Sequence, residues 1–199
     1  MALPKPQITP QEYLAFEREA EIKHEFLDGE IYAMTGASLA HIVINGNIWA
    51  SILSQVRGRG CRSYGSDLRV RVGYHAFFYP DLTIVCGAPL FDAGAGAATL
   101  LNPTCILEIL SPSTEQYDRG AKFLRYQQID SLAQLVFINQ GMPLIECYTR
   151  QGSGAWLYTT AAGLEATLPL ESIGCALRLS EVYEEVALGP LPGEEEETE

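Results

Sequence analysis

Apolar runs along the chain predict most of its strands. Residues 68–72 alternate between apolar and charged side chains, as expected of a strand that is buried on one face. Residues 77–86 and 103–110 are almost continuously apolar, which is typical of more deeply buried strands. Between residues 135 and 159, three apolar runs are separated by glycine-containing turns. These last runs predict an antiparallel meander.

Capping residues and helical spacing predict four helices. The first helix begins with a capping box at Thr9 and ends near residue 20. The second covers residues 39–56, the third runs from Ser113 or Thr114 to about residue 129, and a short last helix runs from Ser180 to about residue 186. We expect Ser38 to cap the second helix and expect five residues on its buried face: Ile42, Gly46, Trp49, Leu53 and Val56.

The order of these elements predicts the fold class. Asp28-Gly29 lies between two strand-like runs and predicts a β-hairpin near the N-terminus. Strands alternate with helices in the first half, which favours an α/β or α+β fold with a mixed sheet flanked by helices. We expect residues 9–188 to form one domain, preceded by an arm at residues 1–8 and followed by an acidic, disordered tail at residues 189–199.

Composition limits the classes of partner. The chain has 199 residues, 47% of them hydrophobic, which is enough for one well-buried core. Its formal net charge of −12 argues against an extended nucleic-acid surface, because duplex binding normally needs an excess of Lys and Arg. One local basic cluster, formed by Arg57, Arg59 and Arg62, could bind phosphate; a solvated loop is the alternative.

Cysteine spacing and hydropathy bear on the compartment. The five cysteines are widely spaced and none forms a C-x-x-C pair, so we expect neither zinc nor a disulfide framework. No apolar run approaches the roughly 20 residues of a membrane helix. The first six residues lack the apolar segment of a signal peptide, so we expect a cytoplasmic protein with no membrane partner.

Two carboxylates in apolar runs are the main candidates for chemistry. Asp81 and Glu108 are 27 positions apart, consistent with adjacent strands joined by a loop. Burying an ionised carboxylate is costly unless it is paired or coordinated. Two carboxylates with water suit Mg²⁺ or Mn²⁺, which lowers the pKa of a bound water. Lys122, on the following helix, is placed to orient that water or to stabilise phosphoryl charge, so this set predicts phosphodiester hydrolysis.

The same residues also allow a purely structural interpretation. Pro-Asp pairs are common at turns, and Glu108 could lie on an edge strand with its side chain in solvent. Lys122 could form a surface pair with Asp118 worth a few tenths of a kcal/mol. His41 is more often structural than catalytic in such a position, and Asp67 is a weaker candidate acid.

Four stretches carry a resemblance to a known family. They are residues 23–30, Tyr79-Pro80-Asp81, the Glu108 strand with residues 110–114, and the Asp118, Lys122 and Tyr126 helix face. In this order they resemble the Uma-type family of restriction-endonuclease-like proteins, within the PD-(D/E)xK nuclease superfamily. The match extends from about residue 9 to about residue 186.

This resemblance implies a restriction-endonuclease-like core and a set of roles. Asp81 and Glu108 would hold Mg²⁺ or Mn²⁺, with the Ile109 carbonyl as a backbone ligand, and Lys122 would be the catalytic lysine. Glu25 resembles an N-terminal acid that supplements the metal site; a plain hairpin residue is the alternative. The superfamily pattern places its lysine two residues after the acid, where this chain has Leu110. The resemblance therefore implies that Lys122 reaches the site from the helix.

Three functions follow from these residues. The first is a metal-dependent endonuclease acting on DNA, which as a homodimer would face both strands of a duplex. The second is a catalytically inactive binding or regulatory module with the same fold. The third is a phosphohydrolase of smaller substrates. Trp49 and Trp156 are expected in the core, so no aromatic stacking platform is predicted.

Overall fold

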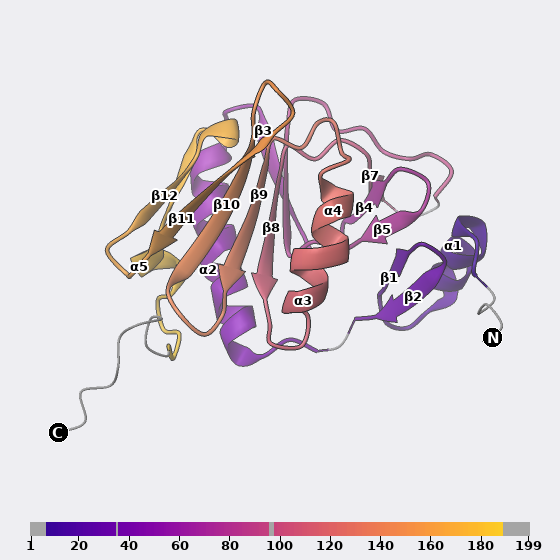
Figure 1. Ribbon diagram of the computed structural model, residues 1–199, viewed down its shortest axis with the longest axis horizontal. Coiled ribbons are helices and arrows are strands. Elements are labelled where there is room, and N and C mark those ends of the chain that lie inside the picture. The colour runs from indigo at the N-terminus through magenta and orange to yellow at the C-terminus, as the bar shows by residue number, and fades with distance from the viewer. Residues whose placement is uncertain (1–6, 35, 96–97, 189–199) are drawn as a thin grey trace.

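A six-stranded mixed sheet forms the centre of the computed structural model, which describes residues 7–34, 36–95 and 98–188 (Figure 1). Its strands lie in the order β11-β10-β9-β8-β6-β3. Their bounds are β3 (Cys61–Gly65), β6 (Leu82–Cys86), β8 (Cys105–Leu110), β9 (Gln134–Asn139), β10 (Leu144–Arg150) and β11 (Trp156–Ala162). Only β8 and β9 run parallel among these neighbours. The predicted mixed sheet and the antiparallel meander over β9, β10 and β11 are confirmed.

A smaller sheet of five strands lies beside the large one, in the order β2-β1-β5-β4-β7. Its strands are β1 (His24–Leu27), β2 (Glu30–Ala33), β4 (Arg69–Val72), β5 (Ala76–Phe78) and β7 (Thr99–Leu100). Helix α1 (Pro10–Glu19) packs on this sheet through Tyr13, which is fully buried against Phe26 and Phe77. This small sheet carries the predicted hairpin.

Local signals in the N-terminal part are confirmed in detail. The Thr9 hydroxyl accepts a hydrogen bond from the Glu12 N–H, and the Glu12 carboxylate accepts one from the Thr9 N–H. At the hairpin turn, Asp28 and Gly29 have φ values of 49° and 89°. Asp and Gly tolerate this left-handed backbone, which matches the twist of a two-residue hairpin.

Helix α2 (Leu39–Val56) covers one face of the large sheet, and its bounds are as predicted (Figure 1). Its predicted buried face is wrong as a stripe, although Val56 is buried as predicted and Trp49 packs partly buried against the core. Ile44, Ile48, Ile52 and Val56 are the buried residues, whereas Ile42 is 57% exposed. Two apolar stripes compete on this helix, and the one with a large side chain at each turn buries more apolar surface than the one that contains Gly46.

The C-terminal segment packs on the same face as α2. It consists of β12 (Thr167–Leu170), a 3₁₀ turn (Glu171–Ile173), β13 (Cys175–Arg178) and α5 (Leu179–Val182). The hairpin of β12 and β13 was not predicted. The last helix begins at Leu179 and ends at Val182, so Ser180 lies within it and is not its cap.

The other face of the large sheet is covered by a short helical segment (Figure 1). It comprises α3 (Glu115–Tyr117), a π-helical turn (Asp118–Lys122) and α4 (Phe123–Tyr126). The prediction of one regular helix to residue 129 is therefore wrong. Such π-helical turns occur frequently at functional sites.

The predicted strand over residues 77–86 is two strands in two different sheets. Strand β5 ends at Phe78 in the small sheet, and β6 begins at Leu82 in the large one. Pro80 lies between them, and because proline has no N–H and a fixed φ, it does not continue a ladder. Asp81 consequently lies where the chain passes from one sheet to the other.

A disulfide joins Cys61 and Cys86, which the cysteine spacing did not predict. The two residues are directly opposite each other in the antiparallel pair of β3 and β6. This proximity depends on strand register and so is not visible in the sequence. Disulfides are typical of oxidising compartments, and the cytoplasmic location stays a prediction. Cys105, Cys147 and Cys175 are reduced and buried, as expected.

Reduction of this disulfide is expected to lower the free energy of unfolding by about 3 kcal/mol, because the bond closes a loop of 25 residues. Thermal unfolding with and without a reductant measures the effect. A variant carrying Cys61→Ser and Cys86→Ser is the control and should not respond to the reductant. An equal response in that variant would show that the effect does not come from the Cys61–Cys86 disulfide.

Some predictions lie partly or wholly outside the described residues. These are most of the arm at residues 1–8 and the whole of the tail at residues 189–199. Residues 96–97 of the glycine- and alanine-rich loop at residues 87–98 also lie outside them. In the described part of that loop, the Ala95 carbonyl accepts a hydrogen bond of 3.0 Å from the buried Arg69 guanidinium. None of the described helices is long and apolar enough to cross a membrane.

Candidate active site

The large sheet brings the two predicted carboxylates together. Strands β6 and β8 are antiparallel neighbours, and Leu82 pairs with Leu107. One step further along this register, Asp81 lies opposite Glu108. The predicted adjacency of the two strands is therefore confirmed. The side chain of Glu108 is only 5% exposed, so the interpretation of Glu108 as a solvent-facing edge residue is wrong.

Lys122 reaches the same place from the π-helical turn. Its Nζ lies 2.9 Å from Glu108 Oε1 and 2.8 Å from Glu25 Oε1. Asp118, about one helical turn earlier, has its Oδ1 3.6 Å from the same nitrogen. The Lys122 side chain is 5% exposed, so it does not form a surface pair. We call Glu25, Asp81, Glu108, Asp118 and Lys122 the carboxylate–lysine cluster.

Glu25 enters the cluster from β1 of the small sheet. It is buried, and its Oε1 accepts hydrogen bonds from the Tyr79 N–H at 3.1 Å as well as from Lys122. Its carboxylate thus ties together the hairpin, the crossing segment before Asp81 and the helix. The contacts of Glu25 with Lys122 and Tyr79 go beyond those of a plain hairpin residue, and its catalytic role stays a prediction.

Asp81 is held through both of its oxygens. Its Oδ2 accepts a 2.7 Å hydrogen bond from the Ile109 N–H, and its Oδ1 lies 3.0 Å from His41 Nε2. His41 is positioned by the start of α2, where the Ser38 hydroxyl caps its N–H. The Ile109 group that contacts Asp81 is the N–H, so the role of the Ile109 carbonyl as a metal ligand stays a prediction.

Burial and like charge dominate the electrostatics of the cluster. Burial raises the pKa of Glu108 to about 8, the Lys122 ammonium opposes this rise, and the charges of Asp81 and Asp118 add to it. Burial likewise raises the pKa of Asp118. For Lys122, burial favours the neutral amine, but the carboxylates of Glu108 and Glu25 outweigh it and raise the pKa of this side chain well above its usual value. Lys122 is therefore a stable cation at neutral pH.

Tyr126 completes the surroundings of Glu108. Its hydroxyl donates a 2.6 Å hydrogen bond to Glu108 Oε1, and burial raises the pKa of this phenol well above its usual value. Tyr126 is therefore a neutral donor. The helix face shared by Asp118, Lys122 and Tyr126 was predicted, but the hydrogen bond to Glu108 was not, because it depends on how the helix packs on the sheet. The same holds for the contact of His41 with Asp81.

Comparisons with known proteins agree with this geometry. The sequence model of the Uma2 family, described as "Putative restriction endonuclease", matches residues 10–180. The chain belongs to the Uma2 family. It is 32% identical over 187 residues to the uncharacterised protein slr1290 of Synechocystis sp., covering 92% of this chain and 95% of that one. It is also 32% identical over 162 residues to the uncharacterised protein sll1609 of the same organism, covering 81% and 91%.

A solved structure shows the same fold. The crystal structure of a "putative nuclease belonging to DUF820" from Anabaena variabilis superposes with a TM-score of 0.73 and 21% identity, covering 88% of this chain and 97% of that chain. The family model confirms the resemblance to the Uma-type family, and the superposition confirms the predicted mixed sheet flanked by helices. In this Uma2 chain, Leu110 is buried in the apolar core beside Tyr126 and Phe137, so the position of the superfamily lysine is filled by packing.

The basic residues that the sequence singled out lie elsewhere in this Uma2 fold. Arg57 follows the last residue of α2, whereas His41 at the first turn of α2 contacts Asp81. An 18-residue helix is about 27 Å long, so the arginine cluster is remote from the carboxylates. Arg59 donates to the Gly174 carbonyl instead. Asp67 does not contact the cluster either, since it forms an exposed ion pair with Lys23 at 3.0 Å.

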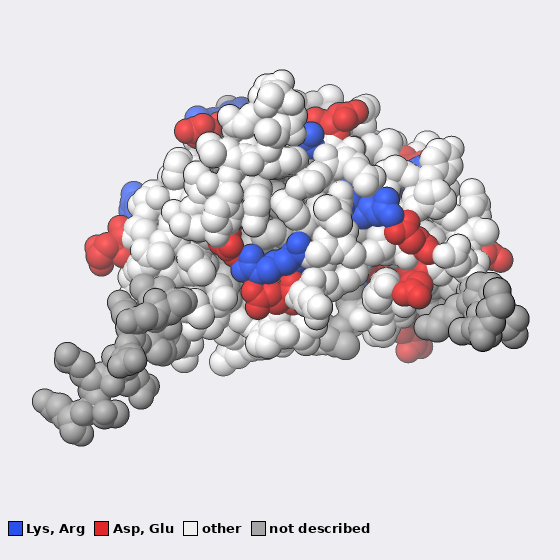
Figure 2. Space-filling view, viewed as in Figure 1, with Lys and Arg blue, Asp and Glu red and all other residues white. Residues whose placement is uncertain are grey.

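The two arginines on the helical segment are neutralised by carboxylates. Arg119 forms ion pairs with Glu115 and Glu146, and Arg125 forms one with Asp28. Figure 2 shows the surface in the same view as Figure 1, and on this face Lys and Arg side chains are few and most lie beside Asp or Glu side chains. The candidate site of this Uma2 protein therefore has little unpaired positive charge around it.

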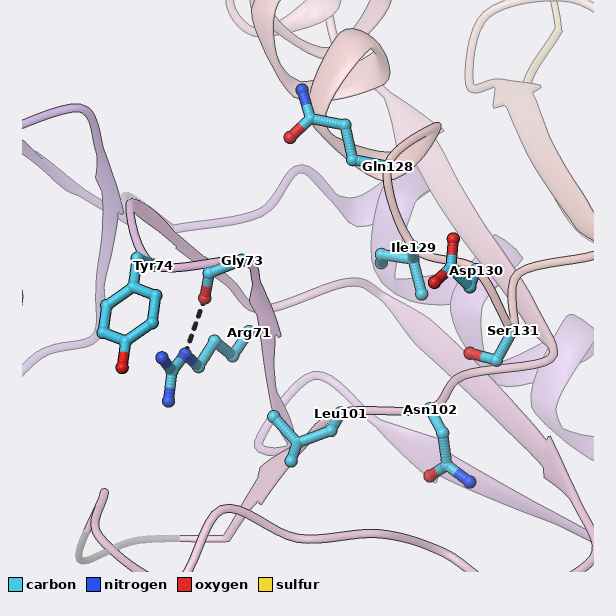
Figure 3. Close-up of a pocket in the computed structure, with 9 residues that line it drawn as sticks. All are labelled: Arg71, Gly73, Tyr74, Leu101, Asn102, Gln128, Ile129, Asp130 and Ser131. Carbon is cyan, nitrogen blue, oxygen red and sulfur yellow. Dashed lines mark hydrogen bonds between the residues drawn. The ribbon is translucent and has the colours of Figure 1, made fainter.

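A cavity of about 550 Å³ lies apart from the cluster. Figure 3 shows it beside the turn between β4 and β5, where the Arg71 guanidinium donates to the Gly73 carbonyl next to Tyr74. Its lining residues are Arg71, Gly73, Tyr74, Leu101, Asn102, Gln128, Ile129, Asp130 and Ser131. None of them belongs to the carboxylate–lysine cluster, so this cavity is not part of the candidate active site.

Proposed function

We propose that this protein is a metal-dependent endonuclease that hydrolyses DNA phosphodiester bonds at the carboxylate–lysine cluster. The observation that carries the proposal is the convergence of Lys122 on Glu108 and Glu25, with distances of 2.9 Å and 2.8 Å, beside Asp81. These residues come from both sheets and from the helical segment. Membership of a family described as "Putative restriction endonuclease" supports the same reaction class.

The charge of the cluster supports a divalent cation. Three carboxylates lie within 3.6 Å of one ammonium, and Asp81 adds a fourth negative charge nearby. Such an excess of buried negative charge is costly unless protons or a cation offset it. Among the described residues, no three His, Cys, Asp or Glu side chains are grouped as a ready-made metal site. Two carboxylates completed by water are nevertheless usual for Mg²⁺ and Mn²⁺.

Asp81 and Glu108 would hold the cation, with the Ile109 carbonyl as a further ligand. The contacts of Glu108 with Lys122 and Tyr126 both involve Oε1, which leaves Oε2 for coordination. A bound Mg²⁺ or Mn²⁺ would lower the pKa of its water and offset charge on the scissile phosphate. In this mechanism Lys122 positions the attacking water and stabilises the phosphoryl oxygens, Glu25 holds the Lys122 ammonium, and His41 and the Ile109 N–H fix the orientation of Asp81.

The site also permits a second function. The neutralised arginines and the acidic balance of the chain favour a catalytically inactive binding or regulatory module with the same fold. A phosphohydrolase of smaller substrates would use the same cluster. Homodimerisation, which would present two clusters to the two strands of a duplex, belongs to the endonuclease proposal and rests on the general preference of soluble oligomers for two-fold symmetry.

Removal of the Asp81 charge is expected to abolish metal binding and cleavage. In Asp81→Asn, calorimetric affinity for Mn²⁺ and Mg²⁺ and the rate of plasmid DNA cleavage should each fall by about a hundredfold or more. The control is Asp67→Asn, because Asp67 is exposed and forms only a surface ion pair. Metal binding without cleavage by the parent would favour the binding module. Absence of metal binding by the parent, with or without DNA, would overturn the proposed site.

A further inference from the structure

Two tyrosines border the Glu25 side of the carboxylate–lysine cluster. Tyr32 on β2 pairs directly with Glu25 on β1, and directly opposed residues in a sheet project to the same face. Tyr117 immediately precedes Asp118, and its ring centroid lies 5.1 Å from that of Tyr32, with the ring planes inclined by 35°. We call Tyr32 and Tyr117 the tyrosine pair.

One member of the pair has an exposed ring, and the other has a buried hydroxyl. Tyr32 is 38% exposed, and its hydroxyl donates a 2.8 Å hydrogen bond to Glu30, which fixes the ring. The Tyr117 hydroxyl is inaccessible and has no hydrogen-bond partner within the described residues. Burial raises the pKa of Tyr117, and the nearby charge of Glu25 raises it further, so this phenol stays protonated. A buried phenol normally has a partner, and an ordered water would satisfy this hydroxyl.

The surrounding charges disfavour binding through phosphates. Duplex affinity depends on several contacts from Lys and Arg to the phosphate backbone. Arg119 and Arg125 are occupied by carboxylates, and Lys122 is buried within the cluster. Stacking of bases on aromatic side chains is the other main source of nucleic-acid affinity, and it adds about 1–3 kcal/mol per base to the phosphate contacts that a protein makes. In a duplex, by contrast, base faces are covered by their neighbours and must be flipped out before they can stack on protein.

We propose that the tyrosine pair is a base-stacking subsite and that the substrate is an unpaired segment of nucleic acid, such as single-stranded DNA or an unpaired flank of a duplex. An unpaired base stacks on the exposed ring of Tyr32, and the ring of Tyr117 packs against that of Tyr32 and holds it in place. This places the adjoining phosphate at the carboxylate–lysine cluster. The inference rests on the proposed function, since it names the substrate class of the same site.

Binding without cleavage tests the subsite. Fluorescence anisotropy in EDTA, with a labelled 12-nucleotide oligothymidine and a 12-base-pair duplex, measures both affinities for the parent protein. We expect the single strand to bind at least about tenfold more tightly than the duplex. Tyr32→Ala should weaken single-strand binding by about tenfold or more, whereas Tyr32→Phe, which keeps the ring, should change it by less than about threefold. Tyr117→Phe, which keeps the ring that packs on Tyr32, should likewise change it by less than about threefold.

Tyr74→Ala is the matched control. Tyr74 is 69% exposed but lines the separate cavity of Figure 3, so its loss should leave binding unchanged. Equal affinity for both oligonucleotides, or equal effects of Tyr32→Ala and Tyr74→Ala, would overturn the subsite. The two proposals fail separately: a parent that binds the single strand through Tyr32 but cuts nothing refutes the nuclease alone. A parent that cuts duplex DNA equally well with Tyr32→Ala refutes the subsite alone.

Discussion

Replacement of Lys122 by methionine is expected to lower the free energy of unfolding by about 3–5 kcal/mol at neutral pH. Methionine fills the space of the aliphatic stem but removes the ammonium that lies within 3.6 Å of three carboxylates. Glu25, Glu108 and Asp118 are then left buried without a cation. Urea denaturation of the parent and the variant, in EDTA, gives the difference directly.

The control for this variant is Arg125→Met, which also removes one positive charge. Arg125 forms a partly exposed ion pair with Asp28, so its loss should cost less than about 1 kcal/mol. The cost of Lys122→Met should shrink as the pH falls, because burial already raises the pKa values of Glu108 and Asp118 and protonation removes their repulsion. A cost equal to that of Arg125→Met would show that Lys122 does not neutralise the cluster.

Local sequence signals predicted much of the fold. The capping box at Thr9 and the turn at Asp28-Gly29 depend on residues within three positions of each other, and the structure confirms both. The pairing of the Asp81 and Glu108 strands was also predicted, because two apolar runs joined by one loop are commonly neighbours. The family resemblance also implied a mixed sheet flanked by helices, and a solved structure shares this fold.

The remaining features depend on tertiary packing. Helix α2 carries two apolar stripes, and only the sheet beneath decides that Ile44 rather than Ile42 is buried. The Cys61–Cys86 bond depends on strand register. The π-helical turn that carries Lys122 has no pattern in the sequence that distinguishes it from a regular helix. The structure therefore departs from the predictions where elements that are distant in the sequence pack against each other.

The sequence predicted which residues form the candidate site better than it predicted the contacts between them. Lys122 was expected to approach Asp81 and Glu108, and its ammonium does contact Glu108. The contact of His41 with Asp81 joins residues 40 positions apart, and sequence spacing alone does not reveal it. The neutralisation of Arg119 by Glu146 likewise joins a helix to β10. Such pairs determine the net charge around the site, and only the folded structure shows which residues form them.

Glu108→Gln is expected to stabilise the metal-free protein at alkaline pH while abolishing metal binding. Burial raises the pKa of Glu108 to about 8 from the ordinary value of 4.5. A carboxyl whose pKa is raised by folding contributes fully to stability below its unfolded pKa and loses that contribution as the pH rises through the folded value. The parent should therefore lose stability between about pH 5 and pH 9, and the glutamine variant, which does not ionise at this position, should lose less.

Thermal unfolding across this pH range, with and without MgCl₂, measures both effects. Mg²⁺ should raise the melting temperature of the parent at pH 8, because a ligand that binds only the folded state stabilises it, and should leave Glu108→Gln unchanged. Glu115→Gln is the control, since Glu115 pairs with Arg119 outside the cluster. Identical pH slopes for the parent and Glu108→Gln would mean that Glu108 is already ionised in the folded metal-free protein.

The two variants together separate a catalytic cluster from a structural one. Lys122→Met makes the cluster more negative and Glu108→Gln makes it less negative, so their effects on the stability of the metal-free protein at pH 8 should have opposite signs. Both should abolish cleavage. A cluster that existed only to stabilise the fold would be weakened by either change, because each removes a partner from the 2.9 Å contact between Lys122 and Glu108. Opposite signs would therefore show that the excess negative charge is retained at a cost in stability, as active sites commonly require.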